Sequence, residues 1–228
     1  MLLSDINELK AVLEIDPRNN SENKLLGFYL EQASNWIQDW LGRQLEKKER
    51  TEFYNGTGTQ RLLLNSRPVF YSSAEPITVY VDQAGYFGSV SGSYTSEDQW
   101  VYGTDFCLNV DQADGSSKSG ILVGIRNFWP RPSLRTYGLL TPYIGEDTGS
   151  VKVTYTGGYT PDTLPSQIRM ACNTLVARMR MMFPLGLEQS ADNYEGRSVS
   201  WDASKKQYLM GLVMPMLGSF RNWSWGRT

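Results

Sequence analysis

Histidine, the side chain that most often exchanges protons or binds zinc near neutral pH, is absent from all 228 residues. Its absence excludes serine and cysteine nucleophiles activated by histidine, and zinc sites built on imidazole. We interpret the two cysteines, Cys107 and Cys172, as small buried apolar side chains rather than as a redox pair. Neither Gly-x-Ser-x-Gly nor Cys-x-x-Cys occurs. We therefore expect no catalytic residue, no metal site and no cofactor.

Four short segments resemble parts of ligand sites. Asp111–Gly115 resembles a calcium loop, but Ala113 stands at the third ligand position and no glutamate follows at the required spacing, so a turn is favoured. Gly56-x-Gly58 lacks the third glycine of a phosphate loop, and a hairpin turn is again favoured. The adjacent carboxylates Glu97-Asp98 and Glu146-Asp147 suit solvated loops better than a metal or glycosidase pair, because neighbouring side chains seldom aim at one point.

Composition narrows the class of protein. The formal net charge is −2 and the pI is about 5.3, which does not suit a general nucleic-acid coat or a polybasic membrane binder. No apolar run approaches the 18 residues of a spanning helix, and the first residues carry no signal-peptide pattern. We expect an intracellular, soluble chain.

Aromatic residues make up 12% of the chain, and two groups of them suggest binding. The first group falls in one loop region and suits either stacking on sugars or bases, or a sheet core with an interface, which we favour. Its members are Tyr86, Phe87, Tyr94, Trp100 and Tyr102. We expect contacts with a neighbouring subunit or another partner protein at all of these except Tyr102.

The second group lies in the C-terminal segment and combines aromatic rings with arginines. These are the residue types that dominate binding hot spots. Its members are Phe220, Arg221, Trp223, Trp225 and Arg227. We favour docking of this segment into a partner subunit over folding back onto its own core. Seven methionines cluster in the same C-terminal third and suit either a core or an adaptable surface.

Periodicity predicts helices at both ends of the chain. A short helix is expected near Ser4–Glu14, and a longer one from an N-cap at Ser21 to a left-handed C-terminal residue at Gly42. Apolar spacing predicts a third helix that ends before Pro184 and a fourth from about Ser204 to Leu217.

The middle of the chain is β-rich. Thr51–Tyr54 and Arg61–Leu64 flank a glycine-rich turn and predict a hairpin, and Ile77–Val81 and Val151–Thr156 alternate as strands do. The predicted fold class is α+β, a helical bundle with an inserted antiparallel β-rich region. The expected domains are residues 1–47 with 160–228, and residues 48–159.

The order of these segments resembles the head–tail connector (adaptor or head-completion) proteins of tailed bacteriophages. The resemblance runs from the helical start to the last helix. It rests on Leu62-Leu63-Leu64-Asn65-Ser66-Arg67-Pro68-Val69, Ile77-Thr78-Val79-Tyr80-Val81-Asp82 followed by Gly85, Tyr102-Gly103-Thr104-Asp105-Phe106, Gly120-Ile121, Trp129-Pro130, Val151-Lys152-Val153-Thr154-Tyr155-Thr156-Gly157-Gly158-Tyr159 and Leu164-Pro165.

This resemblance implies a structural protein with no active site. Such proteins form rings, often of twelve copies, beneath the portal, where they extend the channel for genomic double-stranded DNA and receive a tail-side stopper or tail-terminator protein. The C-terminal segment through Trp223 and Trp225 is then the expected portal contact. The location implied is the neck of the virion, after synthesis in the host cytoplasm. A tail-terminator or tail-tube ring protein and a phage carbohydrate-binding tail module remain alternative hypotheses.

Overall fold

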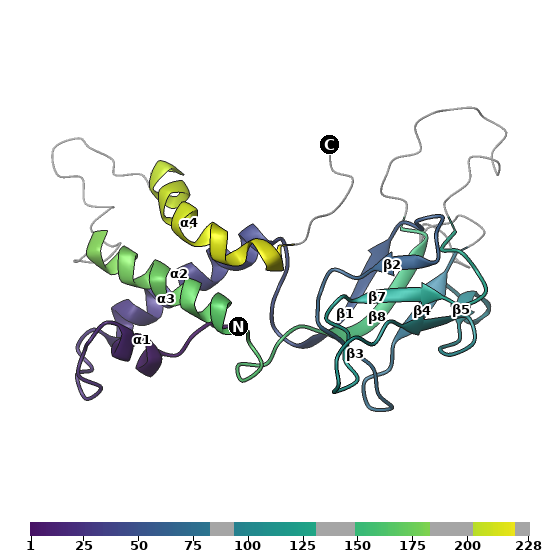
Figure 1. The fold of residues 1–228 in the computed structure, drawn as a ribbon, viewed down its shortest axis with the longest axis horizontal. Coiled ribbons are helices and arrows are strands. Elements are labelled where there is room, and N and C mark those ends of the chain that lie inside the picture. The colour runs from purple at the N-terminus through teal and green to yellow at the C-terminus, as the bar shows by residue number, and fades with distance from the viewer. Residues whose placement is uncertain (83–93, 131–148, 183–202, 222–228) are drawn as a thin grey trace. The chain divides into compact units, whose positions relative to one another are not determined.

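The computed structural model describes residues 1–82, 94–130, 149–182 and 203–221. The chain divides into two compact units, each described by itself. The helical unit comprises Met1–Gln44 and the chain from Thr160 onward, and the β unit comprises Leu45–Tyr159. Helices and antiparallel sheets are thus both present, and the α+β class is confirmed (Figure 1).

Two helices form the first part of the helical unit: α1 is Ile6–Val12 and α2 is Asn23–Leu41. Gly42 ends α2 in the left-handed region with φ 67°, as predicted, because a residue without Cβ adopts that backbone freely. The prediction that Ser21 caps α2 was wrong. Glu22 is the N-cap residue, and the Ser21 hydroxyl donates instead to Asn19 Oδ1 at 2.7 Å.

The described part of this unit contains two more helices: α3 is Ser166–Met182, and α4 is Ala203–Leu217, followed by a short 3₁₀ turn, η4, at Gly218–Phe220. The buried faces of α2 and α3 pack on each other in antiparallel directions. Arg180 near the end of α3 pairs with Glu22 at the start of α2, with Nε to Oε2 at 2.9 Å. Further along the pair, Ser34 Oγ lies 3.8 Å from Cys172 Sγ.

The β unit holds two antiparallel sheets. The larger sheet has the order β1-β8-β4-β5, and β3 also pairs with β8. Its strands are β1 (Lys48–Tyr54), β3 (Val69–Phe70), β4 (Thr78–Val81), β5 (Gln99–Trp100) and β8 (Val151–Gly157); the 3₁₀ turn η1, Ser96–Asp98, precedes β5. The smaller sheet has the order β2-β7-β6, from Arg61–Leu63, Ile121–Gly124 and Phe106–Leu108 respectively.

The predicted hairpin of Thr51–Tyr54 with Arg61–Leu64 was wrong. The first segment pairs with β8 and the second with β7, so they belong to different sheets. The connection between them is held by Trp129 instead of turning on itself: Gly58 N–H donates to the Trp129 carbonyl at 2.8 Å, and Trp129 N–H donates to Thr59 O at 2.9 Å. A Cβ on Gly56 would lie 1.7 Å from the Pro130 carbonyl oxygen, so this close approach requires glycine.

Among the described residues, Trp129 is also the largest fully buried side chain. Its ring stacks on Trp100 with centroids 4.8 Å apart, and its Nε1 donates to Gln60 O at 3.1 Å. The remaining core residues of the β unit come from both sheets and are Leu62, Leu64, Val69, Ile77, Val79, Val81, Phe106, Leu108, Leu122, Val151, Val153 and Tyr155.

A polar network secures the segment between β2 and β3. Glu52 accepts hydrogen bonds from the hydroxyls of Tyr54 and Tyr155, the latter at 2.7 Å, and from Ser66 Oγ at 3.1 Å. The two tyrosine oxygens in turn accept the backbone N–H groups of Asn65 and Ser66, each at 2.9 Å. Burial raises the pKa of both tyrosines, and the charge of Glu52 adds to the rise. The hydroxyls therefore remain protonated donors to Glu52 at neutral pH.

We predict that Trp129→Ala lowers the free energy of unfolding by about 3–5 kcal/mol, because it opens a cavity between the sheets. The adjacent Phe128→Ala is the matched control: Phe128 is 64% exposed, so its removal should change stability by about 0.5 kcal/mol or less. Urea titration followed by circular dichroism measures both changes. Equal losses in the two variants would contradict the core role of Trp129.

Candidate partner-binding surfaces

Four residues gather on the outer face of the larger sheet, and we call them the Tyr94 cluster. Phe53 of β1, Lys152 of β8 and Tyr80 of β4 stand in one row across three adjacent strands. Tyr94 joins this row, with its ring centroid 5.8 Å from that of Phe53. Lys152 Nζ lies 5.6 Å from the Tyr80 ring centroid and 5.7 Å from that of Tyr94. The ammonium group is therefore placed near two aromatic rings.

The alternation of β8 explains why this row faces outward. Val151, Val153 and Tyr155 are buried, while the even-numbered residues between them are only half-buried. A second row, Thr51, Thr154 and Thr78, lies beside the first, with the hydroxyls of Thr51 and Thr154 2.9 Å apart. The outer face thus combines an aromatic row that contains one cation with a hydroxyl row.

The hydroxyl of Tyr94 is anchored. It donates to the Gly149 carbonyl, and the residue holds a left-handed backbone at φ 54°. Burial raises the pKa of Tyr94, and the negative charge of Asp82 adds to the rise, so the hydroxyl stays protonated. Phe53, by contrast, is 59% exposed. The cluster therefore presents one exposed ring beside a hydrogen-bonded ring and a cation.

The predicted surface residues fall into three groups. Tyr94 lies in the surface cluster, and Tyr86 and Phe87 lie outside the described residues. Trp100 must be corrected: it is only 8% exposed and stacks on Trp129, so its side chain is part of the core. The sequence analysis missed Phe53, Tyr80 and Lys152. The alternation of β8 marks Lys152 as outward, but only strand register reveals its neighbours.

The described part of the C-terminal segment touches its own chain. The Arg221 guanidinium carbon lies 5.0 Å from the Trp40 ring centroid of α2, and Phe220 is half-buried in η4. Trp223, Trp225 and Arg227 lie outside the described residues. The described part of the segment therefore contacts α2 at Trp40 through Arg221. This contact differs from the expectation that the segment docks into a partner rather than onto its own core.

The methionines of the helical unit divide between core and surface. Met179 and Met210 are buried, whereas Met170 and Met181 are exposed on the outer side of α3. Both interpretations of these methionines therefore apply, each to different residues. The exposed pair adds apolar area that the helical unit itself does not cover.

The carboxylates of the predicted turns bind their own loops. Asp111 accepts the N–H groups of Lys118 at 2.7 Å and Ser119 at 2.8 Å, in the connection between β6 and β7. Hydrogen bonds from Ser116 lower the pKa of Asp114. Asp98 accepts from Thr95 N–H at 2.9 Å. Glu146 and Asp147 lie outside the described residues. Among the residues that the structure describes, no group of three or more potential metal ligands gathers.

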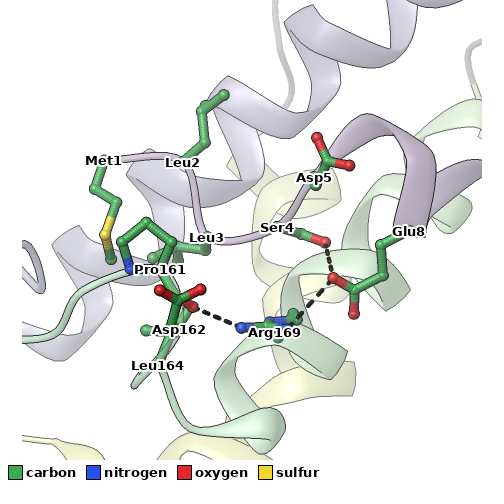
Figure 2. A pocket seen from close by; sticks show the side chains of 10 residues that line it. All are labelled: Met1, Leu2, Leu3, Ser4, Asp5, Glu8, Pro161, Asp162, Leu164 and Arg169. Carbon is green, nitrogen blue, oxygen red and sulfur yellow. Dashed lines mark hydrogen bonds and ion pairs between the residues drawn. The ribbon is translucent and has the colours of Figure 1, made fainter.

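A hollow of about 500 Å³ opens in the helical unit (Figure 2). Two of its charged side chains pair with each other: Arg169 lies 3.7 Å from Glu8, and it also donates to the Pro161 carbonyl at 2.7 Å. Ser4 also donates to Glu8, at 3.4 Å. The other lining residues are Met1, Leu2, Leu3, Asp5, Asp162 and Leu164. These contacts join α1 to the start of α3 and give Glu8 and Arg169 a structural role.

The two cysteines lie in different units. Cys172 of α3 is fully buried, and burial raises its pKa to about 12. Cys107 of β6 is half-buried. The interpretation as buried apolar side chains thus holds for Cys172 and only partly for Cys107.

Comparison with known proteins finds similarity to solved structures only. No family model and no curated protein matches the chain. The chain is similar to one from the neck of an empty GTA particle, computed with C6 symmetry, at 16% identity and a TM-score of 0.49 over 97% of this chain and 91% of that one.

Two further chains are similar at 15% identity. One comes from the neck of a native GTA particle computed with C12 symmetry, with a TM-score of 0.46 over 91% of this chain and 90% of that one. The other comes from the virion of a native gene transfer agent particle, with a TM-score of 0.45 over 92% of this chain and 81% of that one.

Within the described residues, no helix has the length and apolarity needed to cross a bilayer.

We predict that iodoacetamide at pH 8 modifies Cys107 in the folded protein and leaves Cys172 unmodified. A pKa of about 12 leaves roughly one thiol in ten thousand ionised at that pH, and burial also blocks access. Mass spectrometry of labelled peptides measures both sites, and Cys107→Ser should abolish native labelling. Unfolding in urea should expose the second site. Rapid native labelling of Cys172 would contradict its burial.

Proposed function

We propose that this chain is a non-enzymatic structural protein of the neck of a tailed phage or phage-like particle. In this proposal about twelve copies form a ring beneath the portal, and the ring extends the channel for genomic double-stranded DNA. The protein is made in the host cytoplasm and acts in the virion. This role would place it in the same part of a particle as the solved neck chains to which it is similar.

The observation that carries the proposal is the exposure of large apolar side chains on both units. Phe53 is exposed on the sheet face of the β unit, and Met170 and Met181 are exposed on α3 of the helical unit, where Met181 reaches 69%. Aromatic residues and methionine are enriched on surfaces that another protein covers. A subunit placed between a portal, two neighbours and a tail protein needs several such surfaces.

The chemistry of the surfaces suggests how they are used. We assign the tail-side contact, to a stopper or tail-terminator protein, to the Tyr94 cluster together with Tyr86 and Phe87. We assign the portal contact to the C-terminal segment, whose residues are Phe220, Arg221, Trp223, Trp225 and Arg227. The net charge of −2 suits a channel through which DNA slides without sequence-specific binding, because dense basic patches hold DNA tightly at low salt.

The Tyr94 cluster also supports an alternative hypothesis, a carbohydrate-binding tail module, since aromatic faces stack on sugar rings. The burial of Trp100 removes one ring from that surface. A tail-terminator or tail-tube protein would also form rings, but it would bind tail protein and not portal. Mass photometry with portal, and a glycan array, separate the three hypotheses.

We predict that deletion of residues 222–228 abolishes binding to the portal and leaves the fold intact. The deletion keeps Arg221 over Trp40, so the unfolding free energy should change by about 0.5 kcal/mol or less. Sedimentation of the mixed proteins measures ring–portal complexes, and the full-length chain is the control. Unchanged portal binding after the deletion would refute the assigned contact. Particles that retain DNA and join tails without this protein would refute the neck role itself.

We also predict that Phe53→Ser weakens binding to the tail-side protein about tenfold, because it removes an exposed ring from the centre of that contact. Stability and portal binding should stay unchanged. Val110→Ser is the matched control, since Val110 is a 50% exposed apolar residue outside the cluster. Surface plasmon resonance measures both variants, and an equal loss with Val110→Ser would argue against a specific role for the cluster.

A further inference from the structure

The three arginines of α3 differ in the contacts that they make within the described residues. Arg169 pairs with Glu8 of α1, and Arg180 pairs with Glu22 at the start of α2. Arg178 is exposed, and its NH1 lies 3.9 Å from the Met181 sulfur. Within the described ranges it forms no ion pair with a carboxylate. Arg178 and Met181 thus place a positively charged side chain next to an apolar one on the outer side of α3.

The outer side of α2 carries Lys24 in its first turn and two carboxylates further along. Phe28, Glu31, Asn35 and Asp39 recur at helical spacing and are all exposed, opposite the buried stripe of this helix. In the part of the chain that the structure describes, neither Glu31 nor Asp39 forms an ion pair. Phe28 and Glu31 therefore place an apolar side chain next to a negatively charged one on this side of α2.

The two pairs match in spacing. Phe28 and Glu31 are three residues apart, as are Arg178 and Met181. Three residues rise about 4.5 Å along a helix and return to nearly the same face. When α2 of one copy lies antiparallel to α3 of another copy, a single register places Phe28 opposite Met181 and Glu31 opposite Arg178. Asn35 and Thr174 then meet one turn further along.

These two outer sides belong to helices that pack on each other through their buried faces. They consequently point away from each other, and one copy cannot join them. Contact between different surfaces of successive copies is heterologous, so it continues around a ring or along a filament instead of stopping at a dimer.

We propose that the outer side of α2 in one copy binds the outer side of α3 in a second copy, with Glu31 opposite Arg178 and Phe28 against Met181. The proposal rests on the proposed ring and names the contact that builds it. Each copy donates one surface and accepts the other. The contact between copies thereby repeats the antiparallel packing of α2 on α3 that is found inside each helical unit.

Charge reversal tests this contact. Arg178→Glu and Glu31→Arg should each raise the protein concentration needed for ring assembly by about tenfold, since each places like charges opposite each other. The double variant should recover assembly. An equimolar mixture of the two single variants should also recover it, because alternating copies restore an opposite-charge pair at every contact. Arg18→Glu, an exposed reversal in the α1–α2 connection, is the control and should assemble normally.

The measurement is mass photometry of full-length protein, with and without portal, at two salt concentrations. Rings that form equally well in all variants would overturn the proposed contact and leave the neck function standing. Loss of portal binding with normal rings would show that the portal covers this surface, and would also overturn the contact. Recovery of a dimer alone would contradict its heterologous geometry.

Cross-linking provides a second test that does not depend on ring closure. Phe28→Cys and Met181→Cys, combined in a Cys107→Ser background, should react with a short bismaleimide to give a ladder of covalent multimers. Either cysteine alone should give no species beyond a dimer. If neither a ladder nor a ring appears for the chain with or without portal, the contact is refuted. A wild-type chain that never forms rings with portal would refute the proposed function as well.

Discussion

Backbone pairing along β8 is the interaction on which the β unit depends. Val151–Gly157 pairs with β1 along one edge and with β3 and β4 along the other, so three strands attach to it. These partners lie about 70 to 110 positions earlier in the chain, so the larger sheet closes only when the end of the β unit joins its beginning. The same strand makes both core and surface: its odd residues contribute Val153 and Tyr155 to the core, and its even residues place Lys152 in the Tyr94 cluster.

Two glycines end this strand because neighbouring backbone comes very close. A Cβ on Gly157 would lie 2.2 Å from the Ser66 carbonyl oxygen, and one on Gly158, at φ 114°, would lie 2.4 Å from the Glu46 carbonyl oxygen. The Ser66 segment is the one that Tyr155 and Glu52 hold through hydrogen bonds. Two of the motifs that support the resemblance to connector proteins, Leu62–Val69 and Val151–Tyr159, therefore meet where the link between β2 and β3 packs against β8.

In the helical unit, as along β8, one side of each helix builds the core and the other side is exposed. The apolar stripes of α2 and α3 face each other, and Arg180 and Arg169 pair with glutamates within the unit. Side chains on the opposite sides of the same helices lack such partners in the described chain, and Arg178 and Glu31 are the clearest examples. A chain with nearly balanced charge can therefore still place an exposed cationic side chain and an exposed anionic one on different sides of the same unit.

The sequence by itself determined the α+β class, the apolar stripes of the helices, the left-handed end of α2 at Gly42, and the alternation of Ile77–Val81 and Val151–Thr156. These features depend on residues close together in the chain, where helical spacing, strand alternation and glycine act locally. The tertiary structure alone decided which strands pair. Arg61–Leu63 joined β7 instead of its neighbour Thr51–Tyr54 because Trp129, about 70 residues away, binds the backbone between them. It also decided that Trp100 is core and that Phe53, Tyr80 and Lys152 share a surface with Tyr94. Strand register and burial arise from contacts between distant residues, and local sequence carries no record of them.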